Sequence, residues 1–204
     1  MNKIGIMGGT FNPIHIGHLI LAQWVLEEVP LDEIWLIPTG ISYRKLSDEL
    51  VSGQERLHMV KLAIQGNERF RCLDMEVRRE GYTYSYETLE QLKGMYPKND
   101  FFFIVGSDCL FSIENWKFPE RIFNCCTLAA AVRGDTTLEA MKEKKRQLEM
   151  KFMPNERDKI LLLPFMNMSV SSTLIRERIR DGKSVKYLVP DNVLEYMMQK
   201  GFYQ

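Results

Sequence analysis

Short apolar runs alternate along this chain with longer stretches of helical period, and that alternation restricts the folds that the chain can form. The apolar runs predict strands at residues 4–7, 33–38, 70–73, 101–105, 127–132 and 159–163. Helical spacing of apolar residues predicts helices at residues 16–28, 54–64, 86–96, 172–180 and 192–199. Because strands that alternate with helices are joined by right-handed crossovers, we expect an α/β fold with a doubly wound parallel sheet. In such sheets, ligands bind at the carboxyl ends of the strands.

The sequence contains no internal repeat, low-complexity segment or convincing linker. Its 204 residues suit one compact domain, which we expect to span residues 1–204. The part that begins at residue 164 holds the last two predicted helices and no predicted strand. We therefore expect residues 164–204 to form a small helical C-terminal portion of that domain.

The charge balance argues against a general binder of nucleic acids or of membrane surfaces. Lys and Arg together number 27, and so do Asp and Glu, so the formal net charge is zero. Affinity for nucleic acids or anionic membranes comes mostly from excess positive charge. The one basic stretch, residues 142–151, is interleaved with Glu143 and Glu149, which favours a solvated helix face over a partner site.

The sequence also favours a cytoplasmic location. No apolar run approaches the roughly 20 residues that a membrane helix needs, and the N-terminus lacks the pattern of a signal peptide. The cysteines, Cys72, Cys109, Cys125 and Cys126, show no Cys-x-x-Cys spacing, and a disulfide between the adjacent pair would be strained. We expect buried free thiols in a reducing compartment.

A glycine- and histidine-containing segment follows the first predicted strand. Residues 8–18 read Gly-Gly-Thr-Phe-Asn-Pro-Ile-His-Ile-Gly-His. Gly8 and Gly9 let the backbone approach an anion closely, and the free amides at the start of the next helix favour a phosphate there. His15 and His18 are three residues apart, which puts both imidazoles on one face of that helix end. The spacing matches neither Gly-x-Gly-x-x-Gly nor a Walker loop, and no third metal ligand is evident nearby, so we predict a phosphate site without a metal.

A second polar segment, residues 169–176, opens the helix predicted at 172–180. Its serines and Thr173 are helix-capping residues. Arg176 lies about one turn into the helix, from where it can point back toward the helix start. Taken alone, this pattern is typical of a well-capped helix with a surface arginine.

The two segments together resemble the nucleotidyltransferase family. Its signatures are a glycine pair followed by Phe-Asp/Asn-Pro and His-x-Gly-His, and later Ser-Ser-Thr-x-Ile-Arg, and residues 8–18 and 171–176 are similar to both. The resemblance implies a Rossmann-like sheet, with ATP bound by Gly8, Gly9, Thr10, Phe11, His18, Gly106, Asp108, Ser172, Thr173 and Arg176. It implies that the catalytic residues, which hold the triphosphate and neutralise departing pyrophosphate, are His15, His18, Lys45 and Arg176.

The middle of the chain resembles the nicotinate mononucleotide adenylyltransferase branch of that family. The similar strings are Pro-Thr-Gly at 38–40, Arg-Lys at 44–45, Thr-Tyr-Ser-Tyr-Glu-Thr-Leu at 83–89, Gly-Ser-Asp at 106–108 and Trp-Lys at 116–117. The resemblance implies that the acceptor is bound by Thr39, Gly40, Ser85, Trp116, Lys117 and Arg133. In that branch the matching tryptophan stacks on the pyridine ring, for which Trp116 would be a suitable platform. We hypothesise that Lys117 attracts the carboxylate that distinguishes nicotinate from nicotinamide.

The chain departs from the branch pattern at four places. Arg44 replaces the usual histidine, so positive charge is kept in another geometry. Ser85 and Glu87 replace threonine and aspartate, which keeps the functional groups but changes their reach. The proline that usually follows the arginine at position 133 is missing.

We therefore expect an enzyme that moves AMP from ATP to nicotinate mononucleotide, giving nicotinate adenine dinucleotide and pyrophosphate in NAD biosynthesis. The expected partners are these two small molecules, with Mg²⁺ carried by the ATP phosphates. The acceptor phosphate is mostly ionised at neutral pH, so no general base is needed, and catalysis rests on positioning and charge neutralisation. The sequence leaves a homo-oligomer open.

Three other functions fit parts of the pattern. Phosphopantetheine adenylyltransferases share both end signatures but lack the features at residues 83–89 and at Trp116. Class I aminoacyl-tRNA synthetases carry a His-Ile-Gly-His string, but they are longer and have a Lys-Met-Ser-Lys-Ser loop, which this sequence lacks. A catalytically silent adenine-nucleotide sensor is disfavoured by the intact catalytic set, and turnover of labelled ATP would distinguish it.

Overall fold

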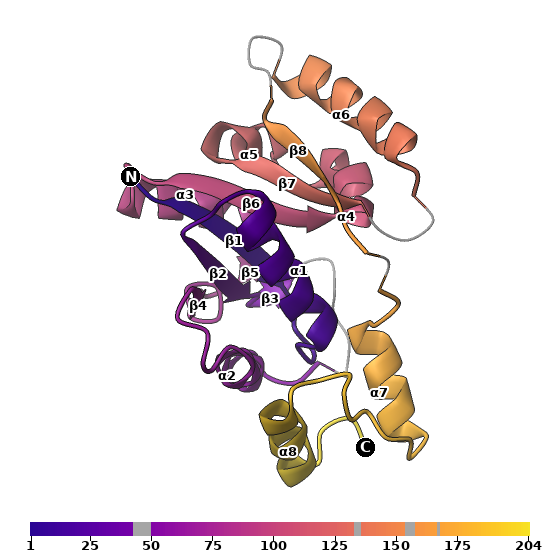
Figure 1. Ribbon diagram of the computed structural model, residues 1–204. Helices are drawn as coiled ribbons and strands as arrows, with labels where there is room; N and C mark the ends of the chain where they lie inside the picture. The colour runs from indigo at the N-terminus through magenta and orange to yellow at the C-terminus, as the bar shows by residue number, and fades with distance from the viewer. Residues whose placement is uncertain (43–49, 133–135, 154–157, 167) are drawn as a thin grey trace. The chain divides into compact units, whose positions relative to one another are not determined.

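The computed structural model describes residues 1–42, 50–132, 136–153, 158–166 and 168–204. Within these ranges, six strands form a parallel sheet in the order β4-β2-β1-β6-β7-β8, with helices flanking it (Figure 1). The strands are β1 (Lys3–Gly9), β2 (Glu33–Pro38), β4 (Phe70–Cys72), β6 (Asp100–Gly106), β7 (Thr127–Val132) and β8 (Ile160–Pro164). The strand order runs outward from β1 in one direction and then in the other, so the predicted doubly wound α/β fold is confirmed.

Helices separate most of the strands, as the alternating sequence pattern predicts. They are α1 (Ile16–Glu28), α2 (Gly53–Ala63), α3 (Ser85–Met95), α4 (Ser107–Ser112), α5 (Pro119–Cys125), α6 (Leu138–Phe152), α7 (Ser172–Arg180) and α8 (Asp191–Lys200), with a 3₁₀ turn η1 (Ile113–Asn115). A separate pair of short parallel strands consists of β3 (Ile41–Ser42) and β5 (Tyr82–Thr83). None of the helices in the described ranges combines the length and apolarity that a membrane crossing requires.

The chain divides into two compact units. The first unit consists of Met1–Met7, Ala22–Ile34 and Tyr84–Met168. The second unit consists of Gly8–Leu21, Trp35–Thr83 and Ser169–Gln204. Each unit therefore combines segments that are far apart in the sequence, and the second contains both signature segments.

The first unit is built on parallel pairing of β1, β6, β7 and β8. In this register Ile4 lies opposite Phe101, Phe103 opposite Leu128, and Leu128 opposite Ile160. All of these side chains are buried. Burial among neighbouring strands and helices explains why these strands appear in the sequence as apolar runs rather than as alternating patterns.

The sequence pattern does not predict the short helices of the first unit that follow β6. α4, η1 and α5 have 6, 3 and 7 residues, which is too short for a clear helical period. α6 is longer, but its buried face consists of Met141, Lys144 and Leu148, so a lysine interrupts the apolar stripe. The basic stretch does form a helix as predicted, whereas the expectation that its face is solvated is wrong at Lys144.

The second unit begins where β1 ends, and β1 runs further than the strand predicted at residues 4–7. β1 continues through Gly9, so the glycine pair belongs to the end of the strand. The turn follows at Asn12 and Pro13, which are joined by a cis peptide bond. Further along the unit, α2 and α8 pack against each other. α7 begins after Ser171, whose Oγ accepts a hydrogen bond of 3.1 Å from the backbone amide of Leu174.

Candidate active site

The glycine-rich end of β1 is shaped by the side chain of Phe11. Phe11 is buried and has a left-handed backbone with φ of 50°. A Cβ atom at Gly9 would lie only 2.9 Å from the Phe11 ring, so a larger residue would displace that ring. The same ring contacts His18 edge-on, with 5.0 Å between the ring centroids. Gly9 is therefore required locally by the packing that places Phe11 against His18.

His15 and His18 lie together at the start of α1, as their spacing predicts. Their rings are stacked with centroids 3.7 Å apart and an interplanar angle of 28°. His15 is buried and His18 is half-buried. Nδ1 of His18 accepts a hydrogen bond of 3.3 Å from the backbone amide of His15. In a neutral imidazole the proton is then on Nε2, which makes this atom a donor suited to a phosphate oxygen.

Gly17 leaves room for this histidine pair. A Cβ atom at Gly17 would lie 3.0 Å from Nδ1 of His15, which is tighter than an ordinary contact. A side chain at this position would therefore push against the His15 ring. The glycine between the two histidines thus contributes to their stacking.

The second signature segment meets the first one within the second unit. Ser172 Oγ donates a hydrogen bond of 2.8 Å to the carbonyl oxygen of Pro13. Arg176 Nη1 donates a bond of 2.9 Å to the carbonyl oxygen of Asn12, and its Nη2 lies 3.5 Å from Oγ1 of Thr173. Arg176 does point back toward the start of α7, as the sequence predicts. The structure thus brings two segments that are separated by about 160 residues to one turn.

A buried arginine that the sequence analysis did not select holds three backbone segments of the second unit. Arg56 is 1% exposed, and its Nη1 donates a bond of 2.7 Å to the carbonyl oxygen of Thr10. Its Nη2 and Nε donate to the carbonyl oxygens of Gly40, at 3.3 Å, and Val51, at 3.1 Å. Burial lowers the pKa of Arg56, but a guanidinium stays charged at neutral pH. The available sequence signal was an arginine that shares one face of the predicted helix with the apolar Val60.

Thr39 and Gly40, which are predicted acceptor residues, follow β2 in the second unit. The backbone amide of Thr39 donates a bond of 2.9 Å to the carbonyl oxygen of Gly9. A Cβ atom at Gly40 would lie 2.2 Å from the carbonyl oxygen of Glu76, so only glycine fits there. The segment after β2 is thereby fixed beside the end of β1, where strand ends in such sheets bind ligands.

The first unit holds another group of predicted residues at the end of β6 and in the turns nearby. β6 ends at Gly106, as predicted, and the exposed Asp108 lies in the first turn of α4. Ser85 is the first residue of α3. Trp116 follows η1 and is half-buried, so it is neither a fully buried core residue nor a free surface residue. Its ring lies 6.2 Å from that of Phe103, edge-on.

Lys117 is exposed and lies over an aromatic ring of the same unit. Its Nζ is 4.4 Å from the centroid of the Tyr84 ring, a cation–π distance. It also lies 5.8 Å from the ring centroid of Phe118. Lys117 follows Trp116 directly in the chain, and its contacts with the Tyr84 and Phe118 rings define the position of its side chain.

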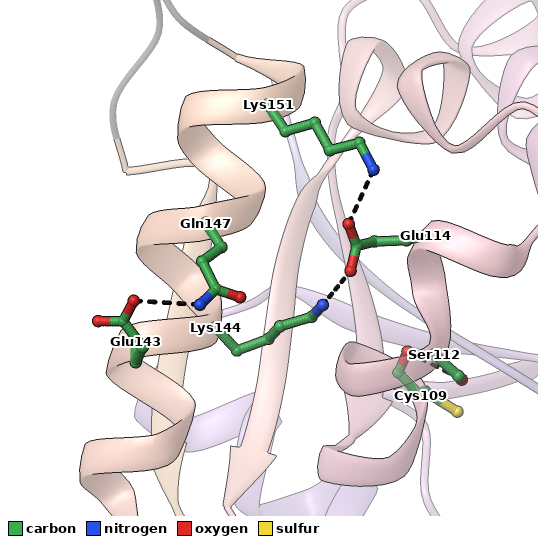
Figure 2. Close-up of polar contacts among 7 residues, drawn as sticks. All are labelled: Cys109, Ser112, Glu114, Glu143, Lys144, Gln147 and Lys151. Carbon is green, nitrogen blue, oxygen red and sulfur yellow. Dashed lines mark hydrogen bonds and ion pairs between the residues drawn. The ribbon is translucent and has the colours of Figure 1, made fainter.

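A carboxylate beside Trp116 is clamped by two lysines of α6. Figure 2 shows the side chains of Lys144 and Lys151 reaching from α6 to the two oxygens of Glu114. The Lys151 bond is 2.9 Å, and Lys144 pairs with the other oxygen. These bonds, led by that of Lys144, lower the pKa of Glu114. Because Glu114 is in η1, the clamp fixes the turn from which Trp116 emerges.

Two predicted residues fall outside the described part of the chain. They are Lys45, a predicted catalytic residue, and Arg133, a predicted acceptor residue; Arg44, which replaces the branch histidine, also lies outside it. In the described ranges, the structure contains no group of three or more His, Cys, Asp or Glu side chains able to hold a metal ion. The predicted residues that are described divide between the two units, with the signature segments in the second and the β6 group in the first.

Comparison with known sequences identifies relatives that match along the whole chain. The profile of a family described as cytidylyltransferase-like matches residues 6–178. A probable nicotinate-nucleotide adenylyltransferase of Lachnoclostridium phytofermentans is 41% identical over 203 residues, which cover 100% of both chains. A probable nicotinate-nucleotide adenylyltransferase of Dehalococcoides mccartyi is 41% identical over 202 residues, covering 98% of this chain and 97% of the relative.

Solved structures share the fold. The Plasmodium falciparum nicotinic acid mononucleotide adenylyltransferase complexed with NaAD aligns with a TM-score of 0.81 and 21% identity, covering 100% of this chain and 98% of that chain. The same protein complexed with APC gives a TM-score of 0.79 at 20% identity, with the same coverage. At this level of identity, the similarity shows that the backbone fold is common to these chains.

Proposed function

This chain belongs to the cytidylyltransferase-like family, and from that premise we propose that it transfers the adenylyl group of ATP to nicotinate mononucleotide. It is an enzyme, a nucleotidyltransferase. The observation that carries the type of reaction is the meeting of the two signature segments, where Arg176 and Ser172 bond to the turn that precedes the stacked histidines. The names of relatives that match the whole chain support nicotinate mononucleotide as the acceptor.

The reaction needs no covalent intermediate. An oxygen of the acceptor phosphate attacks the α-phosphorus of ATP, and a new phosphorus–oxygen bond forms. The bond from the α-phosphorus to the oxygen that bridges to the β-phosphate breaks, and pyrophosphate leaves with that oxygen. Because the attacking phosphate has a second pKa of about 6, it is mostly ionised at neutral pH and requires no general base. The protein's task is to align the two phosphates and to balance the developing charge.

We propose that hydrogen-bond donors of the second unit, both neutral and charged, hold the ATP phosphates. Nε2 of His18 is a donor by the tautomer argument above, and Arg176 supplies a planar cation. The backbone amides at the start of α7, which is capped by Ser171, favour anions through the helix dipole. We extend the catalytic role to His15, which belongs to the first signature segment, and to Lys45, which belongs to the Arg-Lys string at 44–45. Mg²⁺ enters as part of the substrate, bound to the ATP phosphates.

We propose that the remaining predicted residues serve the adenosine and the acceptor. Gly106 and Asp108 would bind the adenosine, and Trp116 would stack on the pyridine ring. Half-burial of Trp116 beside Phe103 supports a rigid platform with part of its surface accessible.

We further propose a cytoplasmic location and a place in NAD biosynthesis. The free thiols of all four cysteines support a reducing compartment.

The experiment that tests the proposal compares acceptors. The pure protein is incubated with ATP and Mg²⁺ and, separately, with nicotinate mononucleotide, nicotinamide mononucleotide or phosphopantetheine, and pyrophosphate release is measured. We expect release chiefly with nicotinate mononucleotide, together with nicotinate adenine dinucleotide as the product. Release only with phosphopantetheine would keep the chemistry and reject the acceptor. Silence with all three acceptors would reject the proposed function.

A further inference from the structure

The end of the chain reaches the turn at Asn12 and Pro13 in the first signature segment, to which the second segment bonds. Tyr203, the penultimate residue, donates a hydrogen bond of 2.7 Å from its phenol to Oδ1 of Asn12. The two residues are 191 positions apart in the sequence. Oδ1 of Asn12 also accepts a bond of 3.3 Å from the backbone amide of Val51. The side chain of Asn12, which is 6% exposed, therefore joins the C-terminal segment to the chain before α2.

The backbone of the same asparagine receives the signature arginine. The carbonyl oxygen of Asn12 accepts the 2.9 Å bond from Nη1 of Arg176. A rotation of Asn12 would move its side-chain oxygen and its carbonyl group together, because both are attached to one residue in a turn. The phenol of Tyr203 thus restrains, through Asn12, the acceptor that fixes one arm of the Arg176 guanidinium.

The surroundings of Tyr203 favour a durable donor at this place. Its backbone is left-handed, with φ of 64°, and follows Gly201, which ends α8 in the same conformation with φ of 64°. Burial raises the pKa of the Tyr203 phenol above its ordinary value of 10.0, so the group keeps its proton at all physiological pH values. Tyr203 and Arg176 also line one cavity of about 370 Å³, together with Arg180. The C-terminal segment therefore lines the same cavity as Arg176 and Arg180.

We propose that Tyr203 is a positioning residue for the phosphate site: through Asn12 it orients Arg176 toward the pyrophosphate part of ATP. This inference rests on the proposed function for the role of Arg176. It adds a contribution from the last residues of the chain, which neither signature segment contains. Tyr203 itself need not touch the ligand, because its bond is made to Asn12.

The test uses the full chain and the substitution Tyr203→Phe, which removes the hydroxyl and keeps the ring. Binding of inorganic pyrophosphate is measured by isothermal titration calorimetry, and KM for ATP and kcat are measured by turnover. We expect the dissociation constant of pyrophosphate and the KM for ATP to rise about fivefold to tenfold, the range that follows from losing one such bond. We expect the KM for nicotinate mononucleotide to stay close to that of the wild type and the melting temperature to fall by only a few degrees, the cost of one hydrogen bond in a chain of this size.

Two comparisons separate positioning from a general loss of structure. Tyr196→Phe removes another hydroxyl of the C-terminal part, one that bonds to Glu55 instead of Asn12, and it should leave pyrophosphate binding unchanged. In an Arg176→Ala background, Tyr203→Phe should cause no further loss, because the group that it orients is absent. Equal losses in Tyr196→Phe, additive losses in the double variant, or unchanged binding in Tyr203→Phe would each overturn the proposal.

The calorimetric measurement also keeps the two proposals distinguishable. It requires no turnover and no acceptor, so a wild-type protein that binds pyrophosphate but makes no dinucleotide overturns the proposed function alone. The effect of Tyr203→Phe on binding then still decides the positioning role. A wild-type protein that does not bind pyrophosphate would overturn the positioning role, because no phosphate site would exist to be oriented.

Discussion

Arg176 donates a hydrogen bond of 2.9 Å from Nη1 to the backbone carbonyl oxygen of Asn12, a residue 164 positions earlier in the chain. The bond fixes the plane of the guanidinium relative to the turn between β1 and α1. Ser172 strengthens the same junction through its bond to Pro13. The phosphate-binding role proposed for Arg176 therefore depends on the shape of the guanidinium as well as on its charge.

The first prediction separates shape from charge at this position. Arg176→Lys keeps the positive charge but loses the planar fork that can bond to Asn12 and to a phosphate at once. We expect kcat to fall by about 10² while the circular dichroism spectrum stays that of the wild type, since removing one transition-state donor typically costs that much. Arg178→Lys on the same helix, whose arginine bonds to the carbonyl oxygen of Ser184, should remain fully active. Wild-type kcat in Arg176→Lys would reduce the role of this residue to charge alone.

The second prediction concerns the donor on the histidine pair. His18→Ala removes Nε2, and we expect a loss of at least about 10² in kcat at saturating substrates. The control is His58→Ala, which alters an exposed histidine on α2 that contacts the ring of Tyr196. We expect this control to retain its activity. A folded His18→Ala enzyme with full activity would contradict the mechanism.

The third prediction concerns stability and the buried Arg56. Arg56→Met fills a similar volume but leaves the carbonyl oxygens of Thr10, Gly40 and Val51 without this donor. We expect the free energy of unfolding, measured with urea, to fall by about 3 kcal/mol or more, because buried acceptors that lose a donor cost about 1 kcal/mol or more each. Arg78→Met is the matched control. Its side chain is 75% exposed and pairs with Asp74, so the change should stay within about 0.5 kcal/mol.

The fourth prediction is a pH dependence that comes from Glu114. Lys144 and then Lys151 lower the pKa of this carboxylate below its ordinary value of 4.5. A group whose pKa is lower in the folded protein contributes stability above its unfolded pKa and loses that contribution as the pH falls through its folded pKa. We expect Glu114→Gln to lower the free energy of unfolding by about 1 kcal/mol at pH 7.

The difference between wild type and Glu114→Gln should narrow as the pH falls below about 4.5, because the carboxylate of the unfolded chain then takes up a proton before that of the folded protein does. Thermal unfolding of both proteins at a series of pH values provides the measurement. A difference that is constant down to pH 3 would show that the ion pairs of Glu114 do not contribute. Because Glu114 holds η1, the variant also tests whether the clamp supports Trp116. If it does, the Trp116 ring should become more solvent-exposed in the variant, and its fluorescence emission should shift to longer wavelength.

The fifth prediction concerns the choice between acid and amide acceptors. Lys117 follows Trp116 and lies over the Tyr84 ring, where it would attract a carboxylate on a stacked pyridine. Lys117→Glu reverses that charge, and we expect the ratio of kcat/KM for nicotinate over nicotinamide mononucleotide to fall about fivefold. Lys98→Glu makes the same charge change at another exposed lysine of the first unit and should leave the ratio unchanged. An unaltered ratio in Lys117→Glu would exclude this role.

Local sequence patterns determined most of the regular structure. The helices predicted at 16–28 and 172–180 and the strands predicted at 33–38 and 127–132 have the bounds that the structure shows. Their apolar periods depend on neighbours within one or two turns, so the pattern can be recognised without the rest of the chain. The capping of α7 by Ser171 and the meeting of His15 with His18 are local for the same reason.

Elements without a clear local pattern were missed. β3 and β5 have two residues each, and α4, η1 and α5 are too short to show a period. Lys144 looks like a solvated residue in the sequence because only the approach of Glu114 explains its burial. In these cases the deciding contact comes from a residue that is distant along the chain.

The sequence by itself therefore determined the doubly wound fold, the two signature segments and the chemistry that they favour. Only the tertiary structure decided that Arg176 and Tyr203 both meet Asn12, and that Arg56 holds the carbonyl groups of three segments. Helices and strands arise from interactions between near neighbours, which leave a periodic record in the sequence. Hydrogen bonds between residues 46 to 191 positions apart leave no such record, because folding alone brings their donors and acceptors together.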